Sequence, residues 1–293
     1  MPTNSHYPGG FPFGVTIRGM PILGVYPRKV FWVDSEGGSN GNDGTFDRPF
    51  DTIDYAVGRC TASRGDVIMV KPGHVETVTA AGGLDLDVIG ISIVGLGNGN
   101  LRPQINFTTA VGADMDVDAA NISMTNFRFT GGVDALTGPI DINAADFSLT
   151  NFVTQDVTGQ ATDFIVTDDA ADRFFLSGWK HIGAAAADAD TAISITGGDD
   201  WTIEDFFIYG NFAVAGIENV TTAANRVRIG GGPNPNYIWT ENAADVAITM
   251  HTDSTGFIGP NLFVMLQDNA ANFAAATVGA AMSFMKPIQI VNL

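Results

Sequence analysis

Three stretches share one pattern: Asn121-Ile-Ser-Met-Thr-Asn-Phe127, Asp146-Phe-Ser-Leu-Thr-Asn-Phe152 and Asp200-Trp-Thr-Ile-Glu-Asp-Phe206. Each starts with Asn or Asp, alternates apolar and polar residues, and ends on Phe, which is typical of a short β-strand with one buried face. Partial copies start at Asp172 and Asn225. The five anchors Asn121, Asp146, Asp172, Asp200 and Asn225 are therefore spaced by 25, 26, 28 and 25 residues. This regular spacing is an internal repeat.

A second alternating element precedes each copy and ends in small residues, as in Met115-Asp-Val-Asp-Ala-Ala-Asn121 and Ile140-Asp-Ile-Asn-Ala-Ala-Asp146. Small residues permit a tight bend, and Asn and Asp tolerate left-handed backbone geometry. The period shows neither helical periodicity nor a leucine-rich frame. Short strands stacked about 4.8 Å apart fit it, so we predict an all-β fold, a single-stranded parallel β-helix. Phe127, Phe152, Trp179 and Phe206 are expected to stack inside this solenoid as an aromatic column.

The repeat divides the chain into four expected segments. Residues 1–30 form an extended N-terminal arm, and residues 31–64 an opening loop with a capping helix near Thr52 to Cys60. Residues 65–260 form the β-helix. Residues 261–293 form an apolar cap or subunit interface, in which the Ala-rich stretch Ala270 to Met285 is compatible with a helix over the open end. Such a cap is needed because an uncovered sheet edge aggregates.

Charge excludes several function classes. The net charge is −18, with only 14 basic residues in 293. Nucleic-acid binding needs Lys and Arg for phosphate contacts, so we expect no nucleic acid as a partner. Adhesion to an anionic membrane is disfavoured for the same reason, and neither a signal peptide nor a membrane span is evident. The lone Cys60 excludes an intrachain disulfide.

The opening of the chain carries more specific motifs: Asn40-Gly-Asn-Asp-Gly-Thr45, then Pro49-Phe-Asp-Thr-Ile53, then Gly65-Asp-Val-Ile-Met-Val-Lys-Pro-Gly-His-Val-Glu76. They resemble the opening coil of pectate-lyase-like right-handed β-helix proteins, in which a short helix closes the solenoid. His74 and Val75 depart from the usual residues of that pattern. The resemblance covers residues 31–78, with the repeat rhythm continuing to about 230. It implies the fold, which hosts lyases, hydrolases and inert spikes alike.

The arm Pro8-Gly-Gly-Phe-Pro-Phe-Gly-Val-Thr-Ile-Arg-Gly-Met-Pro-Ile-Leu23, joined to this opening, is similar to bacteriophage virion proteins with a short β-helix. That resemblance implies a structural protein on the exterior of a phage particle, most simply a head decoration or cementing protein. It also implies a homotrimer that contacts the major capsid protein or other virion proteins. The expected assembly residues are Phe11, Phe13, Val15, Ile17, Ile22 and Leu23.

No catalytic cluster is evident in the sequence, so we expect a protein that is not an enzyme. The alternative is a carbohydrate-active tailspike or depolymerase, either a glycoside hydrolase or a polysaccharide lyase, or else a non-catalytic glycan-binding module. In that case the candidate catalytic residues are Asp146, Asp172 and Asp200, which recur at one turn position on successive coils. Trp201 and Tyr209 are the candidates for stacking against sugars.

Metal binding is a minor alternative. Asp114, Asp116 and Asp118 share one face of a strand, and three carboxylates so placed repel each other unless a cation or solvent relieves them. Solvated turn residues in an acidic protein explain them more simply. We therefore expect no cofactor, with Ca²⁺ as the alternative.

Overall fold

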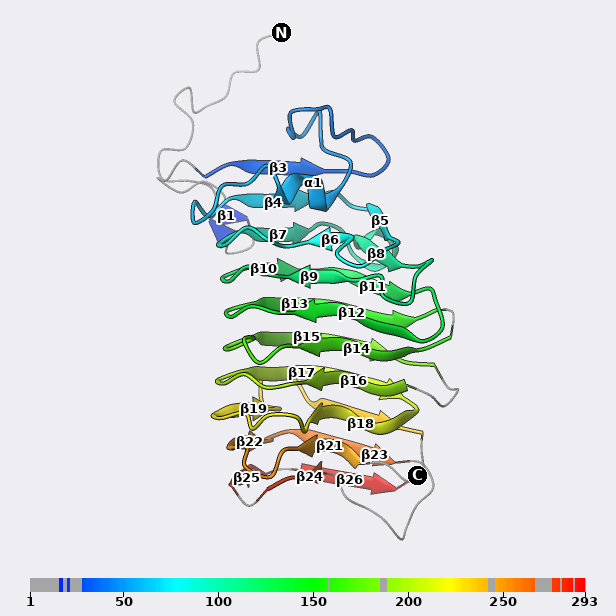
Figure 1. Ribbon diagram of the computed structural model, residues 1–293, viewed down its shortest axis with the longest axis vertical. Helices are drawn as coiled ribbons and strands as arrows, with labels where there is room; N and C mark the ends of the chain where they lie inside the picture. Colours follow the sequence, from blue (N-terminus) through cyan, green and yellow to red (C-terminus); the bar gives the residue numbers. More distant parts are fainter. Residues whose placement is uncertain are drawn as a thin grey trace.

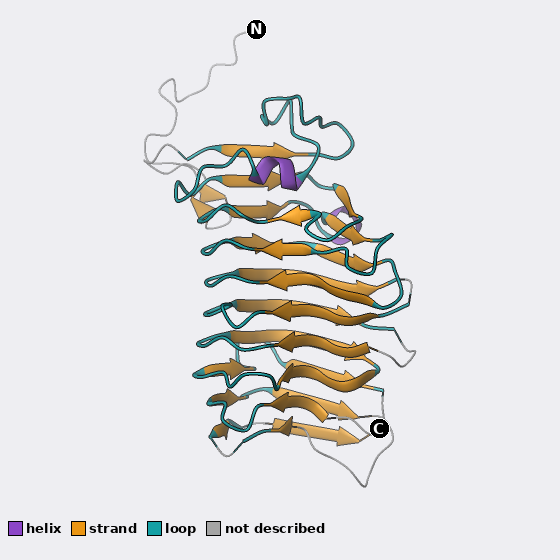
Figure 2. Ribbon diagram, in the orientation of Figure 1, coloured by secondary structure: helices purple, strands orange, loops and turns teal. Residues whose placement is uncertain are grey.

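The computed structural model describes residues 16–17, 20–21, 28–157, 159–184, 189–241, 246–266, 276–279, 281–286 and 288–292. Parallel strands stack coil upon coil along the long axis of the molecule (Figure 1). Among these residues, Figure 2 shows helix only in the N-terminal part, in α1 (Ile53–Val57) and the 3₁₀ turn η1 (Gly99–Leu101). The predicted fold class, an all-β right-handed parallel β-helix, is confirmed.

The solenoid has three faces, which each coil visits in the same order. The first face is an eight-stranded parallel sheet: β6 (Leu84–Asp85), β9 (Met115–Val117), β12 (Leu136–Ile142), β14 (Ala161–Thr167), β16 (Ala189–Ile195), β18 (Phe212–Asn219), β21 (Val246–Met250) and β24 (Ala276–Thr277). The second and third faces are two limbs of one bent sixteen-stranded sheet.

The second face contains β3 (Val30–Val33), β4 (Val67–Val70), β7 (Ser92–Gly95), β10 (Ser123–Thr125), β19 (Val227–Ile229), β22 (Gly256–Ile258) and β25 (Met282–Phe284). The third face contains β5 (Val75–Val78), β8 (Gln104–Phe107), β11 (Arg128–Gly131), β20 (Asn236–Thr240), β23 (Leu262–Leu266) and β26 (Ile288–Asn292). Three long strands run over both faces: β13 (Ser148–Asp156), β15 (Phe175–Ile182) and β17 (Thr202–Gly210). A separate antiparallel pair joins β1 (Thr16–Ile17) to β2 (Met20–Pro21).

Left-handed residues make the bend between the second and third faces. Asn151, Gly178 and Asp205 lie at the bends of β13, β15 and β17 with φ of 52°, 67° and 53°. Asn126 has the same geometry, with φ of 68°, between β10 and β11. Asn and Asp accept this conformation more readily than other side chains do, which explains their recurrence in the repeat.

The predicted aromatic column lies inside the solenoid. Phe127, Phe152, Trp179 and Phe206 are all at most 1% exposed. The rings of Phe152 and Trp179 stack with centroids 5.7 Å apart, because β13 and β15 pair these residues directly. Trp179 also donates its indole N–H to the Thr154 hydroxyl at 2.8 Å, so its polar atom is satisfied in the core.

The opening helix is shorter than predicted. It spans Ile53–Val57, and Thr52 caps it by accepting a hydrogen bond from the Tyr55 N–H. Ile53, Ala56 and Val57 turn toward the core. The helix covers the first coils, as the opening motif indicated, and it is far too short to cross a membrane; none of the helices in the described ranges is long and apolar enough to do so.

The C-terminal helix was a wrong expectation where the structure describes that segment. Residues 276–277 and 282–284 form β24 and β25, which pair with β21 and β22. Strands β23 and β26 likewise extend the third face past residue 260. The preceding coil presents unpaired backbone N–H and C=O groups in register. The chain therefore adds another strand to each sheet instead of forming a helix.

Candidate functional site

The residues that follow Phe127, Phe152, Trp179 and Phe206 point outward on the third face. Strand register aligns these four with residues of the neighbouring strands into one row, which runs from Gln104 through Arg128, Val153, Lys180, Phe207 and Tyr237 to Phe263. We call this the outer row. Its N-terminal half is polar and cationic, and its C-terminal half is aromatic. Aligning the repeat on Phe127, Phe152, Trp179 and Phe206 gives four of these positions from sequence, although no catalytic motif marks them.

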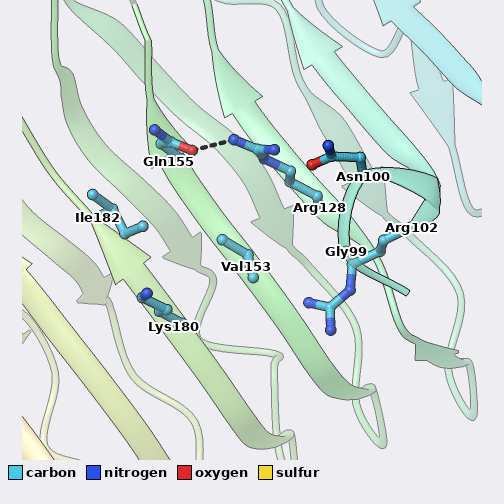
Figure 3. Close-up of a pocket in the computed structure, with 8 residues that line it drawn as sticks. All are labelled: Gly99, Asn100, Arg102, Arg128, Val153, Gln155, Lys180 and Ile182. Carbon is cyan, nitrogen blue, oxygen red and sulfur yellow. Dashed lines mark hydrogen bonds between the residues drawn. The ribbon is translucent and has the colours of Figure 1, made fainter. Parts of the chain in front are cut away.

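An open pocket lies over the polar half of the outer row. It encloses about 310 Å³ and is lined by Gly99, Asn100, Arg102, Arg128, Val153, Gln155, Lys180 and Ile182 (Figure 3). Arg102 comes from the loop after η1, whereas Arg128 and Lys180 come from β11 and β15. We call it the cationic pocket, because it brings together three basic side chains that lie 26 and 52 residues apart in the chain (128 − 102 and 180 − 128).

The three cations contact only neutral groups among the described residues. Arg128 donates from Nη2 to the Gln155 side-chain oxygen (Figure 3), and Arg102 donates from Nη2 to Asn151 Oδ1 at 3.2 Å. Lys180 Nζ lies 5.9 Å from the centre of the Phe207 ring. Burial and the neighbouring Arg128 lower the pKa of Arg102. The pocket is thus a patch of unneutralised positive charge.

Aromatic side chains cover the other half of the third face. Phe207, Tyr237 and Phe263 follow one another along the outer row, with ring centroids 6.2 Å and 5.2 Å apart. Beside them, Tyr209 and Trp239 pair on β17 and β20 with centroids 5.3 Å apart. All five rings are partly exposed. We call these five residues the aromatic platform; only Tyr209 was foreseen.

A carboxylate lies at the edge of the platform. The Tyr209 hydroxyl donates to Glu241 Oε1 at 2.5 Å. This hydrogen bond is the main cause that raises the pKa of Tyr209 to about 12, with burial adding to it. Tyr209 therefore stays neutral, and Glu241 provides the acidic group next to the aromatic rings.

The predicted catalytic aspartates have another role in the structure. Asp146 binds Arg173 through two hydrogen bonds of 2.7 and 2.9 Å, and Asp200 binds Arg226 in the same way at 2.6 and 2.7 Å. Asp172 accepts the Asp199 N–H at 2.7 Å. The arginines lower the pKa of both Asp146 and Asp200. These side chains tie neighbouring coils together at a corner, and the lowered pKa of Asp146 and Asp200 makes these two carboxyl groups poor general acids.

The candidate calcium ligands Asp114, Asp116 and Asp118 lie on the first face, in and beside β9. No group of three or more His, Cys, Asp or Glu side chains is placed to hold a metal ion in the described part of the chain. Asp116 is instead paired in register with Asp85 and Asp141. Burial, followed by repulsion from nearby carboxylates, raises the pKa of Asp116 and of Asp141 to about 6.

Trp201, the second predicted stacking residue, must be corrected. It is fully buried, and its ring stacks on Phe174 with centroids 5.3 Å apart. It sits one residue after the left-handed Asp200, which turns it inward, so it offers no face to a ligand. Of the predicted assembly residues, Ile17 lies in β1, while Phe11, Phe13, Val15, Ile22 and Leu23 lie outside the described residues.

Comparison with known proteins yields structural neighbours alone. No family model and no curated protein sequence matches the chain. A GH136 lacto-N-biosidase from Eubacterium ramulus matches with a TM-score of 0.46 and 14% identity, over 90% of this chain and 68% of that one. A rhamnogalacturonan lyase matches with a TM-score of 0.43 and 16% identity, over 82% and 67%.

These neighbours fit the β-helix, and both are enzymes that act on carbohydrates. The expectation that the chain is not an enzyme is not upheld: it rested only on the lack of a recognisable catalytic cluster in the sequence, and both neighbours are named as enzymes. The predicted role in a phage particle gains no support from the comparisons. Similarity at this level establishes no activity for this chain, and its own side chains are the evidence for its function.

Proposed function

We propose that this chain is a carbohydrate-active enzyme that holds a glycan along its third face. The observation that carries the proposal is the outer row itself, in which an aromatic platform continues directly into the cationic pocket. Sugar rings present C–H faces that pack on aromatic rings and hydroxyl edges that need hydrogen-bond partners. The third face offers both along one straight line.

The platform suits a chain-like ligand better than a compact one. Its rings come from β17, β20 and β23, so they repeat at the spacing of neighbouring strands, about 4.8 Å. Each partly exposed ring supplies a rigid contact area at low entropic cost, as aromatic side chains do in binding surfaces. An extended glycan laid across the coils would meet these rings in succession.

Cleavage requires groups that move protons, and two flank the platform. Lys180 adjoins Phe207 across the β15–β17 pair, and Glu241 is hydrogen-bonded to Tyr209. In hydrolysis a carboxyl group can act as the base, and an ammonium group can donate a proton to the leaving oxygen. We therefore assign the bond-breaking chemistry to the region between Lys180 and Glu241.

A glycan panel tests this proposal. Purified protein is incubated with neutral and acidic polysaccharides, and products are followed as new reducing ends and as unsaturated sugars. We expect release from at least one glycan, with a loss of about tenfold or more in Tyr237→Ala and Trp239→Ala and a larger loss in Glu241→Gln or Lys180→Met. Phe257→Ala is the matched control, because Phe257 is 50% exposed but lies on the second face.

Two results would contradict the proposal. One is a broad panel with neither binding nor product release. The other is activity that Tyr237→Ala and Phe257→Ala reduce equally, since that would remove any special role of the third face.

A second candidate places hydrolysis on the first face. Asp116 and Asp141 are directly paired across β9 and β12, and both have a pKa raised to about 6, so one can be protonated while the other is ionised. If this pair is the catalytic site, Asp116→Asn and Asp141→Asn abolish product release while Tyr237→Ala leaves it intact. The opposite pattern selects the third face.

A further inference from the structure

We infer that the cationic pocket is a subsite for an anionic group of the glycan, a carboxylate or a sulfate. This inference rests on the proposed function and specifies its substrate class. It also assigns Arg102, Arg128 and Lys180 a role that differs from that of the other basic side chains.

Most other basic residues of the described chain are already neutralised. Six form ion pairs with carboxylates: Arg48, Arg64, Lys71, Arg173, Arg226 and Arg228. In a chain with 32 acidic residues and 14 basic ones, carboxylates are the commonest partners available. Yet within the described residues none of the three pocket cations has one. This separation of charge indicates that the positive groups are kept available for a partner outside the chain.

The donors in the pocket are only partly used. Arg128 Nε is buried and has no hydrogen-bond acceptor among the described residues, although Nη2 binds Gln155. Arg102 and Arg128 line the same pocket, so their like charges repel each other, and this repulsion adds to burial in lowering the pKa of Arg102. A bound anion would relieve this repulsion and accept from the free donors. The planar fork of Arg is well matched to the oxygens of a carboxylate or sulfate.

The selectivity of such a subsite is local. A protein of net charge −18 repels anionic polymers at long range. Salt screens that repulsion over about 8 Å at physiological ionic strength, whereas direct contacts in a partly buried pocket are screened much less. Any preference for an anionic glycan must therefore come from the pocket.

Two matched polymer pairs test the inference in the full-length protein. Polygalacturonate is compared with its fully methyl-esterified form for the carboxylate arm, and dextran sulfate with dextran for the sulfate arm. Binding is measured by titration calorimetry at physiological salt for the wild type, Arg128→Gln, Lys180→Gln and the control Arg59→Gln. Arg59 is exposed beside α1, so its replacement makes the same charge change far from the pocket.

We expect the wild type to bind one anionic polymer at least about tenfold more tightly than its neutral counterpart, the value of one charge-assisted contact. Arg128→Gln and Lys180→Gln should each remove most of that preference, and Arg59→Gln should keep it. Preference in one arm alone identifies the anion.

Equal binding of charged and neutral polymers by the wild type would overturn the inference while leaving the glycan proposal intact. An equal loss in Arg59→Gln would overturn it too, because the effect would then be one of overall charge. Absence of binding to both anionic polymers would reject the subsite. The proposed function is tested separately by product release from the glycan panel.

Discussion

At the scale of single residues, one left-handed backbone position decides what the corner aspartates do. Asn121, Asp146 and Asp200 occupy it with φ near 60°, and in two coils Arg173 and Arg226 take the same position. Each arginine then reaches the aspartate of the preceding coil. The sequence showed the recurring acid but not its partner, because the arginine lies one residue past the expected anchor.

The carboxylates of the first face give a prediction about pH. Folding raises the pKa of Asp116 and Asp141 from 3.8 to about 6, first through burial and then through neighbouring carboxylates. Between these values the folded protein holds protons that the unfolded chain has released. Their contribution to stability is therefore greatest at the acid end of this window and declines as the pH rises through 6.

We expect the thermal unfolding midpoint to rise by a few degrees when the pH falls from 7 to 5. The double variant Asp116→Asn, Asp141→Asn should be more stable at pH 7 and show a flatter profile, as measured by scanning calorimetry. Asp190→Asn, in β16 of the same face, is the control, because Asp190 does not contribute to the raised pKa of Asp116 or Asp141. Parallel profiles for the wild type and the double variant would contradict the prediction.

At the scale of elements, the short opening helix depends on contacts from outside itself. Thr52 accepts from the Tyr55 N–H at 3.3 Å, and the buried Glu76 accepts from the Ile53 N–H at 2.9 Å. Glu76 belongs to β5, so one side chain joins the helix to the coil beneath it. A helix of five residues has little stability of its own, and these contacts satisfy its free N–H groups.

Thr52→Ala should lower the free energy of unfolding by about 1 kcal/mol, the usual cost of losing an N-cap. Denaturant titration measures this value, with the exposed Thr79→Ala as the control of equal chemistry. An unchanged midpoint for Thr52→Ala would show that the helix end is satisfied in another way.

The aromatic column predicts a larger effect. Trp179 is buried, stacks on Phe152 and donates to Thr154, so Trp179→Ala should cost about 3–5 kcal/mol. Trp179→Phe retains most of the packing and should cost less. Chemical unfolding of both variants checks the order. Because both variants lack the indole N–H, nearly equal costs would show that the hydrogen bond matters more than the packed volume.

Sequence predicted this column well, because the repeat places an aromatic residue at the same position of each coil. It predicted the C-terminal elements poorly. Composition between Ala270 and Met285 is rich in Ala and suits a helix, yet β24 and β25 form because the preceding coil offers a template for pairing. Such tertiary pairing overrides local preference, and no local pattern records it.

At the scale of the whole molecule, the fold could be derived from spacing and the candidate site could not. Arg102, Arg128 and Lys180 look unrelated along the chain, and no short motif connects them. Their meeting depends on the pairing of Arg128, Val153 and Lys180 across three strands. Once the period is known, the register can be read from the repeat, but Arg102 enters from a loop that has no counterpart in it.

The described solenoid begins before residue 31, since β3 starts at Val30 and pairs with β4. Removing residues 1–27 should therefore leave the β-helix folded, with an unchanged far-ultraviolet circular dichroism spectrum. The predicted homotrimer stays a prediction. Light scattering of the full chain and of this truncated form tests both the trimer and the assembly role expected for the arm.

The strict one-residue contribution of every coil to the outer row has a consequence for how this surface can change. Duplicating a single coil would add one position to the row and lengthen it by about 4.8 Å, while each interior layer kept neighbours of the same kind. The length of the outer row can therefore change by one position at a time, through the gain or loss of one coil. Variation in ligand length can then arise through whole-coil gain or loss, without any redesign of the core.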